Sequence, residues 1–579
     1  MVAAKSPATL SCVLTESLAS SLADIAMRNL LITTALLAAI IAPVNAQEDL
    51  DFGDVTERHE MIPMRDGIRL SAYLYTPSDN GPWPAIFEQR YAGLRAASTR
   101  KGAAELARAG YVVALVNYRG THVSEGKWVG YRALQWGELS DGYDTCEWLA
   151  KQDWCTGKIG TFGSSQGGYA QNYLAVTGPP HLTCQYMVDT GLSLFHEGYR
   201  IGGTTRPERF KGMSGICRDP QDNEDLLKEW FAHPTYDDYW RDEDCTLHFD
   251  KMNVPCLTIG SWYDFMNQGS IASFIGRQHQ GGRNSRGSQK LLIGPWLHGR
   301  TNKDYKVGEL TYPENAAWGV HPHMIKWFDH HLKGKSNGAD KEPAVRYYVM
   351  GAVGEEDAPG NVWRTADDFP PAAVLTPMFL HAEGGLSTVR PTSTSSSTSY
   401  VSDPLHPMEI PSGGFPGARD ARPFEEQSEV RTFTTDTLTA PTEWTGRIQA
   451  ELYVTSTALD TDFIVRVSDV YPDGRSILIV DYPLRARYRE GFDKEVLMTP
   501  GEVHKVAFPV GWISQLFNKG HRIRVTVAST GAPYYEPNPQ NGKPLTIEFP
   551  NDAQKATNTV HHNSQFASHI IAPVMPLGE

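Results

Sequence analysis

The sequence has no group of cysteines and histidines at the spacing of a metal site, and it has no excess of positive charge. Lysine and arginine number 53 against 67 aspartates and glutamates, which gives a net charge of −14. A chain this acidic is not expected to bind nucleic acid or an anionic membrane surface, because both attract positive proteins. The adjacent pair His330-His331 follows Trp327 and Phe328 on an expected helix, and we interpret it as structural.

Long hydrophobic runs are missing as well. The apolar stretch of residues 30–42 is shorter than the roughly 20 residues that a membrane-spanning helix needs. Met27-Arg28-Asn29 precedes it and Val44-Asn45-Ala46 follows it, which is the layout of a signal peptide cleaved near Ala46. We therefore expect export to the periplasm or the medium, with translation starting at Met1 or Met27. A buried or anchoring helix is the alternative interpretation.

Cysteine is scarce, with seven residues in the chain, and Cys12 lies in the segment that signal cleavage would remove. Six cysteines remain, and an even number of cysteines in an exported protein favours disulfides. Cys146 and Cys155 lie close in sequence around the end of an expected helix, and we predict them as the first pair. The alternative is that the remaining six are free and mostly buried thiols: Cys146, Cys155, Cys184, Cys217, Cys245 and Cys256.

Strand and helix patterns alternate from about residue 66 to about residue 190, which is typical of an α/β fold. Residues 192–251 interrupt this alternation with aromatic and charged residues, and we predict a helical cap there. Apolar strands return at 254–259 and 290–293. The predicted core therefore has two parts, residues 50–191 and 252–369.

A different pattern begins after Pro370-Pro371, which marks a boundary. Short strand patterns separated by glycine and proline turns predict a β-sandwich or jelly roll over residues 372–579. Residues 392–399 are nearly all serine and threonine, and we predict a mobile loop there.

The stretch of residues 160–168 lies between an expected strand and an expected helix and has many glycines. Its pattern Gly163-x-Ser165-x-Gly167 is that of a nucleophile elbow, in which a sharp turn exposes the serine hydroxyl. The helix that follows would place its N-terminus there and favour developing negative charge. Taken alone, the pattern fits a glycine-rich turn with a solvated serine equally well.

Two later strands also end in loops with reactive residue types. Asp264 follows the strand at 254–259, and His298 follows the strand at 290–293. The chain order Ser165, Asp264, His298 is that of α/β-hydrolases, with each residue just past the C-terminal end of a strand. The histidine would take the serine proton and return it to the leaving group. The aspartate would fix the tautomer of the histidine and stabilise its charged form.

Several further motifs resemble those of the CocE/NonD hydrolase family, which includes cocaine esterase, α-amino-acid ester hydrolases and X-prolyl dipeptidyl-peptidases. The resemblance covers nearly all of residues 55–545. Its main motifs are Arg119–Gly126, Gly157–Gly168, His233–Trp240, Gly260–Asp264, Gly294–Gly299, Trp327–Gly334, Asp460–Phe463, Val470–Arg475, Arg485–Arg489 and Gly520–Arg524.

The resemblance implies an α/β-hydrolase core with an inserted helical cap, followed by a C-terminal all-β jelly-roll domain. It also implies Ser165 as nucleophile, Asp264 as acid and His298 as base. The oxyanion hole would consist of the backbone N–H of Gln166 and the hydroxyl of Tyr91. A tyrosine that only packs is the alternative interpretation of Tyr91.

The sequence departs from the family pattern at two places. Most relatives have tyrosine after the nucleophile, where this chain has Gln166, so we expect one aromatic wall of the acyl pocket to be lost. The α-amino-acid ester hydrolases carry carboxylates just past the catalytic acid, where this chain has Phe265-Met266-Asn267. A substrate ammonium would lack that anchor, so we expect unsubstituted acyl esters to be preferred.

The sequence thus predicts an exported serine hydrolase that acts on a small-molecule ester or amide without a cofactor and without a metal. An aminopeptidase, amidase or X-prolyl dipeptidyl-peptidase is the alternative enzyme. A carbohydrate-binding or scaffold protein that uses the jelly roll is the non-enzyme alternative. No nucleic acid and, after signal cleavage, no membrane is expected as a partner. The acyl and leaving groups and the oligomeric state, homo-oligomer included, stay open.

Overall fold

The computed structural model describes residues 50–77, 80–205, 210–299, 305–410 and 417–576. The fold and the site lie in one compact unit, residues 54–579. The expected signal segment, its cleavage near Ala46 and the alternative start at Met27 fall outside the described residues. Among the helices that are described, none combines the length and the apolar character needed to cross a membrane.

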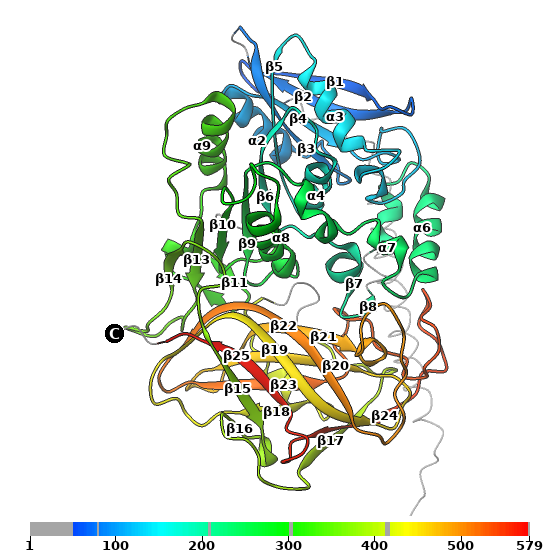
Figure 1. Cartoon of the computed structure of the whole chain (residues 1–579), viewed down its shortest axis with the longest axis vertical. Coiled ribbons are helices and arrows are strands. Elements are labelled where there is room, and N and C mark those ends of the chain that lie inside the picture. Colours follow the sequence, from blue (N-terminus) through cyan, green and yellow to red (C-terminus); the bar gives the residue numbers. More distant parts are fainter. Residues whose placement is uncertain (1–49, 78–79, 206–209, 300–304, 411–416, 577–579) are drawn as a thin grey trace, which may run out of the picture. The chain divides into compact units, whose positions relative to one another are not determined.

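A ten-stranded sheet forms the centre of the first part of this unit (Figure 1). Pairing is parallel from β4 to β13 through β3, β5, β6, β9 and β10, and antiparallel at both edges. Buried strands such as β4, in which all six residues are buried, explain the continuous apolar run at 111–116. The order across the sheet is β1 (Thr56–Pro63), β2 (Arg69–Thr76), β4 (Val112–Asn117), β3 (Trp83–Arg90), β5 (Cys155–Ser164), β6 (Leu182–Val188), β9 (Cys256–Ser261), β10 (Lys290–Gly294), β13 (Val345–Val349) and β14 (Val362–Ala366).

Helices cover both faces of this sheet. On one face, α2 (Ala97–Arg108) and α9 (Val320–Lys333) pack side by side, and Lys333 Nζ donates to the carbonyl of Ala109 just past α2. On the other face lie α3 (Asp141–Ala150), α4 (Gln166–Thr177) and α8 (Asn267–Gln280), which contact β5, β6 and β9. The sheet is therefore doubly wound, and its parallel strands end at one common edge.

The segment between β6 and β9 contains short helical elements around an aromatic cluster. It begins with a single π-helical turn, Leu194–Gly198, a feature that often marks functional sites. Tyr199 and Trp230 stack with ring centroids 3.5 Å apart, and Phe210 meets Tyr199 edge to face at 4.4 Å. The other elements are β7 (Arg200–Ile201), β8 (Thr204–Thr205), α6 (Pro220–Ala232) and α7 (Asp238–Arg241).

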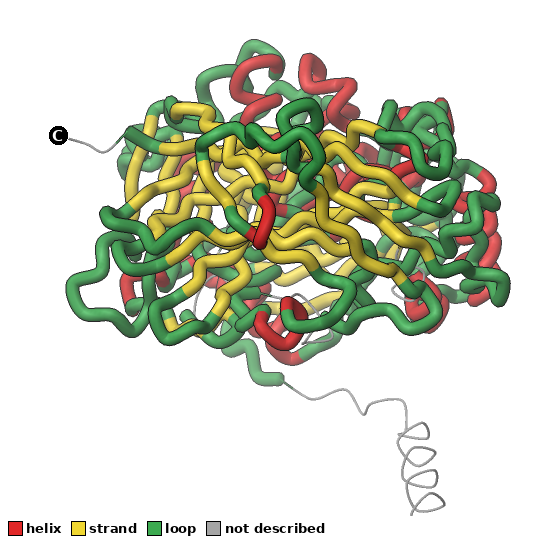
Figure 2. The backbone as a smooth tube through the Cα atoms, turned by 90° about the horizontal axis from the view of Figure 1, so that it is seen from below, coloured by secondary structure: helices red, strands yellow, loops and turns green. Residues whose placement is uncertain are grey.

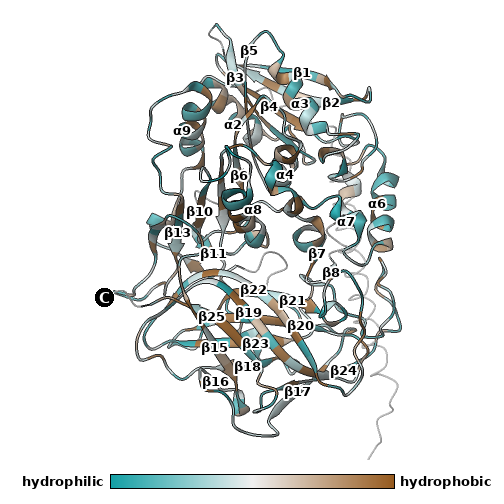
Figure 3. Ribbon diagram, viewed as in Figure 1, coloured by the Kyte–Doolittle hydropathy of each residue, from teal (hydrophilic) through white to brown (hydrophobic). Residues whose placement is uncertain are grey.

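The C-terminal part consists of two antiparallel sheets packed face to face (Figure 2). Hydrophobic residues concentrate along their strands, for example Leu452, Val465 and Val525, which are all fully buried (Figure 3). The first sheet contains β16 (Leu386–Ser387), β15 (Val374–Leu380), β25 (His569–Val574), β19 (Thr442–Ser456), β24 (Ala556–His561) and β17 (Ser397–Ser402), with β22 (His504–Phe517) also on β19; the second contains β18 (Arg431–Thr434), β23 (Arg522–Ala528), β20 (Asp462–Val470) and β21 (Ser476–Arg485).

The C-terminal part is joined to the α/β part within the same compact unit. Backbone bridges connect Met350, after β13, to Gln515 of β22. Gly202, in the turn between β7 and β8, accepts a backbone hydrogen bond from Arg485. The predicted combination of an α/β-hydrolase core and a C-terminal β domain is confirmed.

Two predictions about local structure are wrong. Cys146 and Cys155 are free thiols, as are the other four described cysteines. Cys146 points from α3 into the apolar core and is fully buried, whereas the Cys155 sulfur accepts the N–H of Gly157. Residues 397–399 of the expected mobile loop belong to β17, because they pair with Thr559–His561 of β24.

Candidate active site

Ser165 lies on the turn between β5 and α4 and has a strained backbone, with φ 57° and ψ −113°. A non-glycine residue with positive φ is uncommon and is typical of a nucleophile elbow. Its N–H donates to the carbonyls of Val188 and Asp189, both at 3.0 Å. These bonds fasten the turn to the end of β6 and so hold the strained conformation.

The glycines on either side of Ser165 have a steric reason. A Cβ atom on Gly163 would lie 3.0 Å from Glu88 Cγ, and one on Gly167 would lie 3.2 Å from Glu88 Oε1. Gly163 also has φ +139°, which L side chains rarely adopt. The close packing inferred from the sequence is therefore packing against the buried Glu88 side chain of β3.

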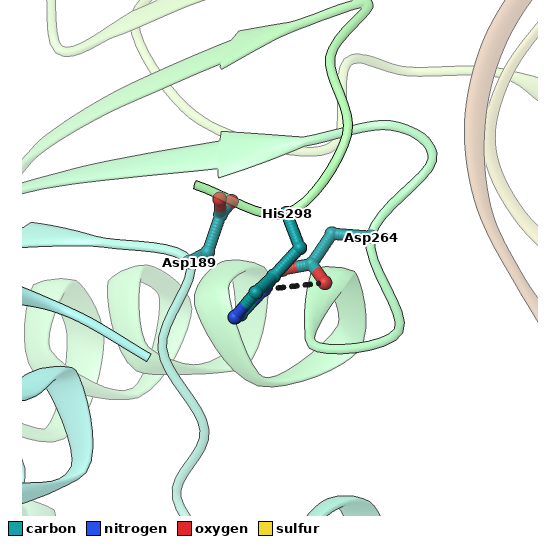
Figure 4. Close-up of side chains that lie close together, drawn as sticks. All are labelled: Asp189, Asp264 and His298. Carbon is teal, nitrogen blue, oxygen red and sulfur yellow. Dashed lines mark hydrogen bonds and ion pairs between the residues drawn. The ribbon is translucent and has the colours of Figure 1, made fainter. Parts of the chain in front are cut away.

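Asp264 and His298 are in direct contact (Figure 4). His298 Nδ1 lies 2.9 Å from Asp264 Oδ1, and the two residues follow β9 and β10. The Asp264 side chain is fully buried, and 17% of the His298 side chain remains accessible. A buried carboxylate at Nδ1 fixes the tautomer of a histidine and stabilises its charged form.

Asp189, directly after β6, completes this group although the sequence did not point to it. Its Oδ2 accepts the N–H of Gly299 at 2.7 Å, and its carbonyl accepts the N–H of Ser165 at 3.0 Å. Asp189 therefore links the turn of the serine to the loop of the histidine. Burial, followed by the nearby charge of Asp264, raises the pKa of Asp189 to about 8, so its carboxyl is protonated at neutral pH.

Among the described residues, Asp189, Asp264 and His298 also form a group that could hold a metal ion, since one ligand atom from each lies within 4.8 Å of the others. Asp264 Oδ1 is paired with His298 and Asp189 Oδ2 with a backbone N–H, while Asp264 Oδ2 and Asp189 Oδ1 are buried without a hydrogen-bond partner. We therefore interpret the group as two carboxyls that position one histidine.

The loop after β3 carries Tyr91, and the side chain of Gln166 holds it. Gln166 Oε1 accepts the N–H of Tyr91 at 2.8 Å and the N–H of Ala92 at 2.9 Å. The Tyr118 hydroxyl donates to the Gln166 carbonyl at 2.7 Å. Gln166 thus takes on a role that a tyrosine at the same position could not, because a tyrosine has no amide oxygen to accept both N–H groups.

Further contacts fix the same loop. Asn117 Nδ2 donates to the carbonyl of Ala92 at 3.0 Å, and the His122 ring lies 2.9 Å from the carbonyl of Tyr91. The Tyr91 ring meets Tyr118 and Trp128 edge to face, with centroids 5.8 and 5.9 Å apart. The tyrosine therefore stands on a rigid aromatic base at the edge of the sheet where Ser165 lies.

The structure brings most of the predicted site residues together. Asp264 and His298 touch, Tyr91 and Gln166 touch, and Ser165 is joined to the histidine loop through Asp189. Asp189 and the contacts of the Gln166 side chain were not predicted from the sequence. Asp189 follows an apolar strand, as Asp264 does, so the same strand-end criterion could have found it.

Comparison with known proteins places these residues in a family context. The model of the X-Pro dipeptidyl-peptidase (S15 family) matches residues 66–218 and 214–300. The model of the X-Pro dipeptidyl-peptidase C-terminal non-catalytic domain matches residues 337–571. The two matched regions correspond to the α/β part with its insertion and to the C-terminal β domain.

Full-length relatives agree with this division. The chain is 29% identical to the cocaine esterase of Rhodococcus sp., over 89% of this chain and 98% of that enzyme. An α-amino acid ester hydrolase structure aligns with a TM-score of 0.81 and 24% identity, over 92% of this chain and 100% of that chain. An aminopeptidase structure from a Thaumarchaeota archaeon aligns with a TM-score of 0.81 and 23% identity, over 93% and 99%. The chain belongs to the CocE/NonD family, and it is a serine hydrolase.

Proposed function

We propose that the protein is an exported hydrolase that cleaves carboxylic esters through an acyl-enzyme on Ser165. The observation that carries this proposal is the strained Ser165 turn, tied through Asp189 to the loop of a histidine that a buried aspartate holds. Serine, histidine and aspartate at three strand ends form the arrangement that acyl transfer needs.

In the first step, the Ser165 oxygen attacks the substrate carbonyl while His298 Nε2 takes the serine proton. The carbonyl oxygen becomes an oxyanion, which the N–H of Gln166 and the hydroxyl of Tyr91 would stabilise. The tetrahedral intermediate collapses as His298 returns the proton to the departing alcohol. Water, deprotonated by His298, then attacks the acyl-enzyme and releases the acid and free Ser165.

An X-prolyl dipeptidyl-peptidase or amidase is the second candidate, because both matching family models are described by that activity. Such enzymes must hold the amino group of the substrate. Asp264 is followed by Phe265, Met266 and Asn267, and none of these three carries a negative charge to pair with an ammonium. Burying an unpaired ammonium is costly, so esters without an α-amino group should be better substrates.

A fluorophosphonate probe combined with a substrate screen tests the proposal. Wild-type protein should be labelled at Ser165 and should cleave p-nitrophenyl butanoate faster than Gly-Pro-p-nitroanilide. Ser165→Ala should show neither labelling nor turnover. Folded wild-type protein that is not labelled would contradict the enzyme assignment, and preference for the anilide would favour the peptidase.

Export needs its own measurement, because it rests on the pattern of residues 27–46. Full-length protein expressed in a Gram-negative host should be recovered from the periplasm with Gln47 as its first residue. Recovery of uncleaved protein from the cytoplasm would contradict export and leave the hydrolase assignment unaffected.

A further inference from the structure

A cavity of about 540 Å³ lies where the α/β part, its inserted segment and the C-terminal domain meet. Binding sites for small organic molecules have volumes of roughly 300–1,000 Å³, so this cavity could hold a sizeable part of a substrate. Its walls come from the π-helical turn after β6, from α8, and from β19, β21 and β22.

The cavity adjoins the candidate catalytic residues. Phe265, on its wall, directly follows Asp264, and its ring centroid lies 5.0 Å from that of His298. A smaller neighbouring cavity is lined by Asp264 itself and shares Phe265 and Trp512 with the larger one. Among the described residues, Ser165 and His298 line neither cavity, and Phe265 is the wall residue that contacts the His298 ring. A group attached to an ester at Ser165 would therefore have to pass Phe265 to enter the large cavity.

Most of the cavity wall is apolar or aromatic. Such a wall binds hydrocarbon or aromatic groups by removing them from water. The side chains that provide it are Phe249, Phe265, Ala272, Ile275, Leu484, Phe492, Phe508 and Trp512.

Two arginines, Arg447 of β19 and Arg489, also line this cavity. Arg447 Nη2 lies 3.3 Å from Gln268 Oε1, and the Arg447 guanidinium lies 5.7 Å from the centroid of the Trp512 ring. No carboxylate of the described part of the chain lies within ion-pair distance of it. Arg489, which also lines the cavity, differs because its guanidinium donates to the carbonyls of Ala486 and Val496.

The other titratable groups on the wall do not neutralise Arg447. Glu197 Oε1 accepts the N–H groups of Leu192 and Ser193, and Glu197 Oε2 is enclosed inside the protein. Burial raises the pKa of Glu197 to about 8, so it is uncharged at neutral pH. Burial lowers the pKa of His196, so it too is uncharged there. The cavity therefore carries positive charge from Arg447 and from Arg489, and Arg489 lies 3.6 Å from a carboxylate oxygen of Glu490.

We propose that this cavity binds an anionic, otherwise apolar part of the substrate, with a carboxylate paired to Arg447. The inference rests on the proposed esterase function and narrows its substrate class to esters that carry a carboxylate at a distance from the reacting carbonyl. A guanidinium matches a carboxylate in shape and charge, and Arg447 is exposed, so a carboxylate can reach it from solvent. The alternative role of Arg447 is to fasten β19 to α8 through Gln268.

Two matched pairs of esters test the proposal. On the acyl side, p-nitrophenyl hydrogen suberate is compared with its methyl ester. On the alcohol side, 4-(butanoyloxy)phenylacetate is compared with its methyl ester. In at least one pair, Arg447→Gln should lower kcat/KM for the carboxylate about 10-fold or more while leaving the neutral partner nearly unchanged. Arg447→Lys should keep part of the preference.

The comparison within each pair cancels the intrinsic reactivity of the ester. An equal loss of kcat/KM for the carboxylate and the neutral ester of each pair would show that Arg447 only connects β19 to α8, and it would overturn the proposal. A lower melting temperature with no change in substrate preference would do the same. If no ester is cleaved and Ser165 is not labelled, the proposed function itself fails. Cleavage that ignores the carboxylate overturns the anionic site alone.

A measurement on the wild-type protein covers the case in which Arg447→Gln does not fold. 4-Phenylbutanoate should inhibit hydrolysis of p-nitrophenyl butanoate at a lower concentration than 4-phenylbutanamide does. The difference should shrink as salt is added, because salt screens the guanidinium. Equal inhibition by the acid and the amide at low salt would overturn the proposal.

Discussion

Among the described residues, one histidine–aspartate pair in the α/β part and one in the C-terminal domain have similar geometry and a buried aspartate. In the α/β part, His298 Nδ1 lies 2.9 Å from Asp264; in the C-terminal domain, His521 Nδ1 lies 2.7 Å from Asp469. His521 Nε2 is also engaged, at 2.9 Å from Glu355, and its side chain is fully buried. The His298 side chain keeps 17% of its surface accessible, beside the strained Ser165 turn.

The difference separates a structural pair from a candidate catalytic one. A buried histidine whose two ring nitrogens both contact carboxylates has no free nitrogen for a substrate, and it holds Glu355, after β13, against the C-terminal domain. A histidine at a strand end, with one aspartate behind it and access in front, can pass a proton. Contact with an aspartate is therefore not enough to identify a catalytic histidine. The histidine must also be accessible and lie near a nucleophile.

The largest effect should come from removing the members of the accessible site. Ser165→Ala and His298→Ala should each lower kcat by about 10³-fold or more, because a triad acts as one unit. The double variant should be little worse than either single variant. Multiplying losses would show that the two residues act independently and would break the distinction between the two histidines.

The two acids near His298 should differ strongly. Asp264→Asn should lower kcat on the order of 10³–10⁴-fold, because an amide no longer fixes the histidine tautomer. Asp189→Asn should lower kcat far less. The Asp189 carboxyl is uncharged at neutral pH, and the amide oxygen of asparagine can still accept the N–H of Gly299. Steady-state kinetics of both variants at pH 7 compare them, and a larger loss from Asp189→Asn would reverse the two roles.

Tyr91→Phe comes next in size. The change removes the hydroxyl and keeps the ring that packs on Tyr118 and Trp128. Loss of one oxyanion donor should lower kcat on the order of 10²–10³-fold with little change in melting temperature. Turnover near the wild-type level would reduce Tyr91 to a packing residue.

Gln166→Leu tests whether the loop of Tyr91 needs the two hydrogen bonds that the Gln166 side chain accepts. The variant leaves the N–H groups of Tyr91 and Ala92 without their acceptor, and the resulting shift of the loop should lower kcat on the order of 10-fold to 100-fold. In the Tyr91→Phe background the same change should have almost no further effect on kcat. A full additional loss in that background would show that Gln166 acts on something other than Tyr91.

His521→Gln should have the smallest effect on turnover and a clear effect on stability. It leaves Asp469 buried without its charged partner, which should cost about 3 kcal/mol, while kcat and Ser165 labelling stay unchanged. A loss of labelling in the folded variant would make the two histidine pairs less distinct than their exposure indicates.

The stability that His521 contributes should depend on pH. Burial alone would lower the pKa of His521, but hydrogen bonds and charges from Asp469 and Glu355 outweigh it and raise the pKa above 6.5. The stabilisation is therefore complete below pH 6.5 and is lost as the pH rises through the raised value. Melting temperatures of wild type and His521→Gln should converge from pH 6 to pH 9, and a gap that widens would contradict this.

Some of these features follow directly from the sequence. The strand-end positions of Ser165, Asp264 and His298 were predictable because each follows an apolar strand, and parallel strands end at one edge. Strand β1, Thr56–Pro63, was not predicted, because its residues are mostly exposed and lack clear alternation. Its extended shape comes from antiparallel pairing with β2 along its whole length. Tertiary pairing, rather than local propensity, decides such an edge strand.

Other features depend on side-chain direction, which the sequence does not encode locally. Cys146 and Cys155 are close in the chain, yet one points into the core and the other lies at the start of β5. The Gln166 side chain reaches residues 74 and 75 positions away, and that contact exists only once β3 and β5 are paired. Arg447 resembles any strand arginine until the fold brings it beside Gln268 of α8, on the wall of a cavity.

The shared walls of that cavity bear on how such enzymes can diversify. The reacting groups belong to the α/β part, whereas Arg447, Tyr482 and Trp512 reach the cavity from the C-terminal domain. A chimaera that keeps residues 50–369 and takes the remainder from a relative would retain the reaction and inherit the relative's choice of substrate. If the cavity binds substrate as proposed, mutations in the second half of the gene would change which substrates are accepted and leave the proposed reacting groups in place.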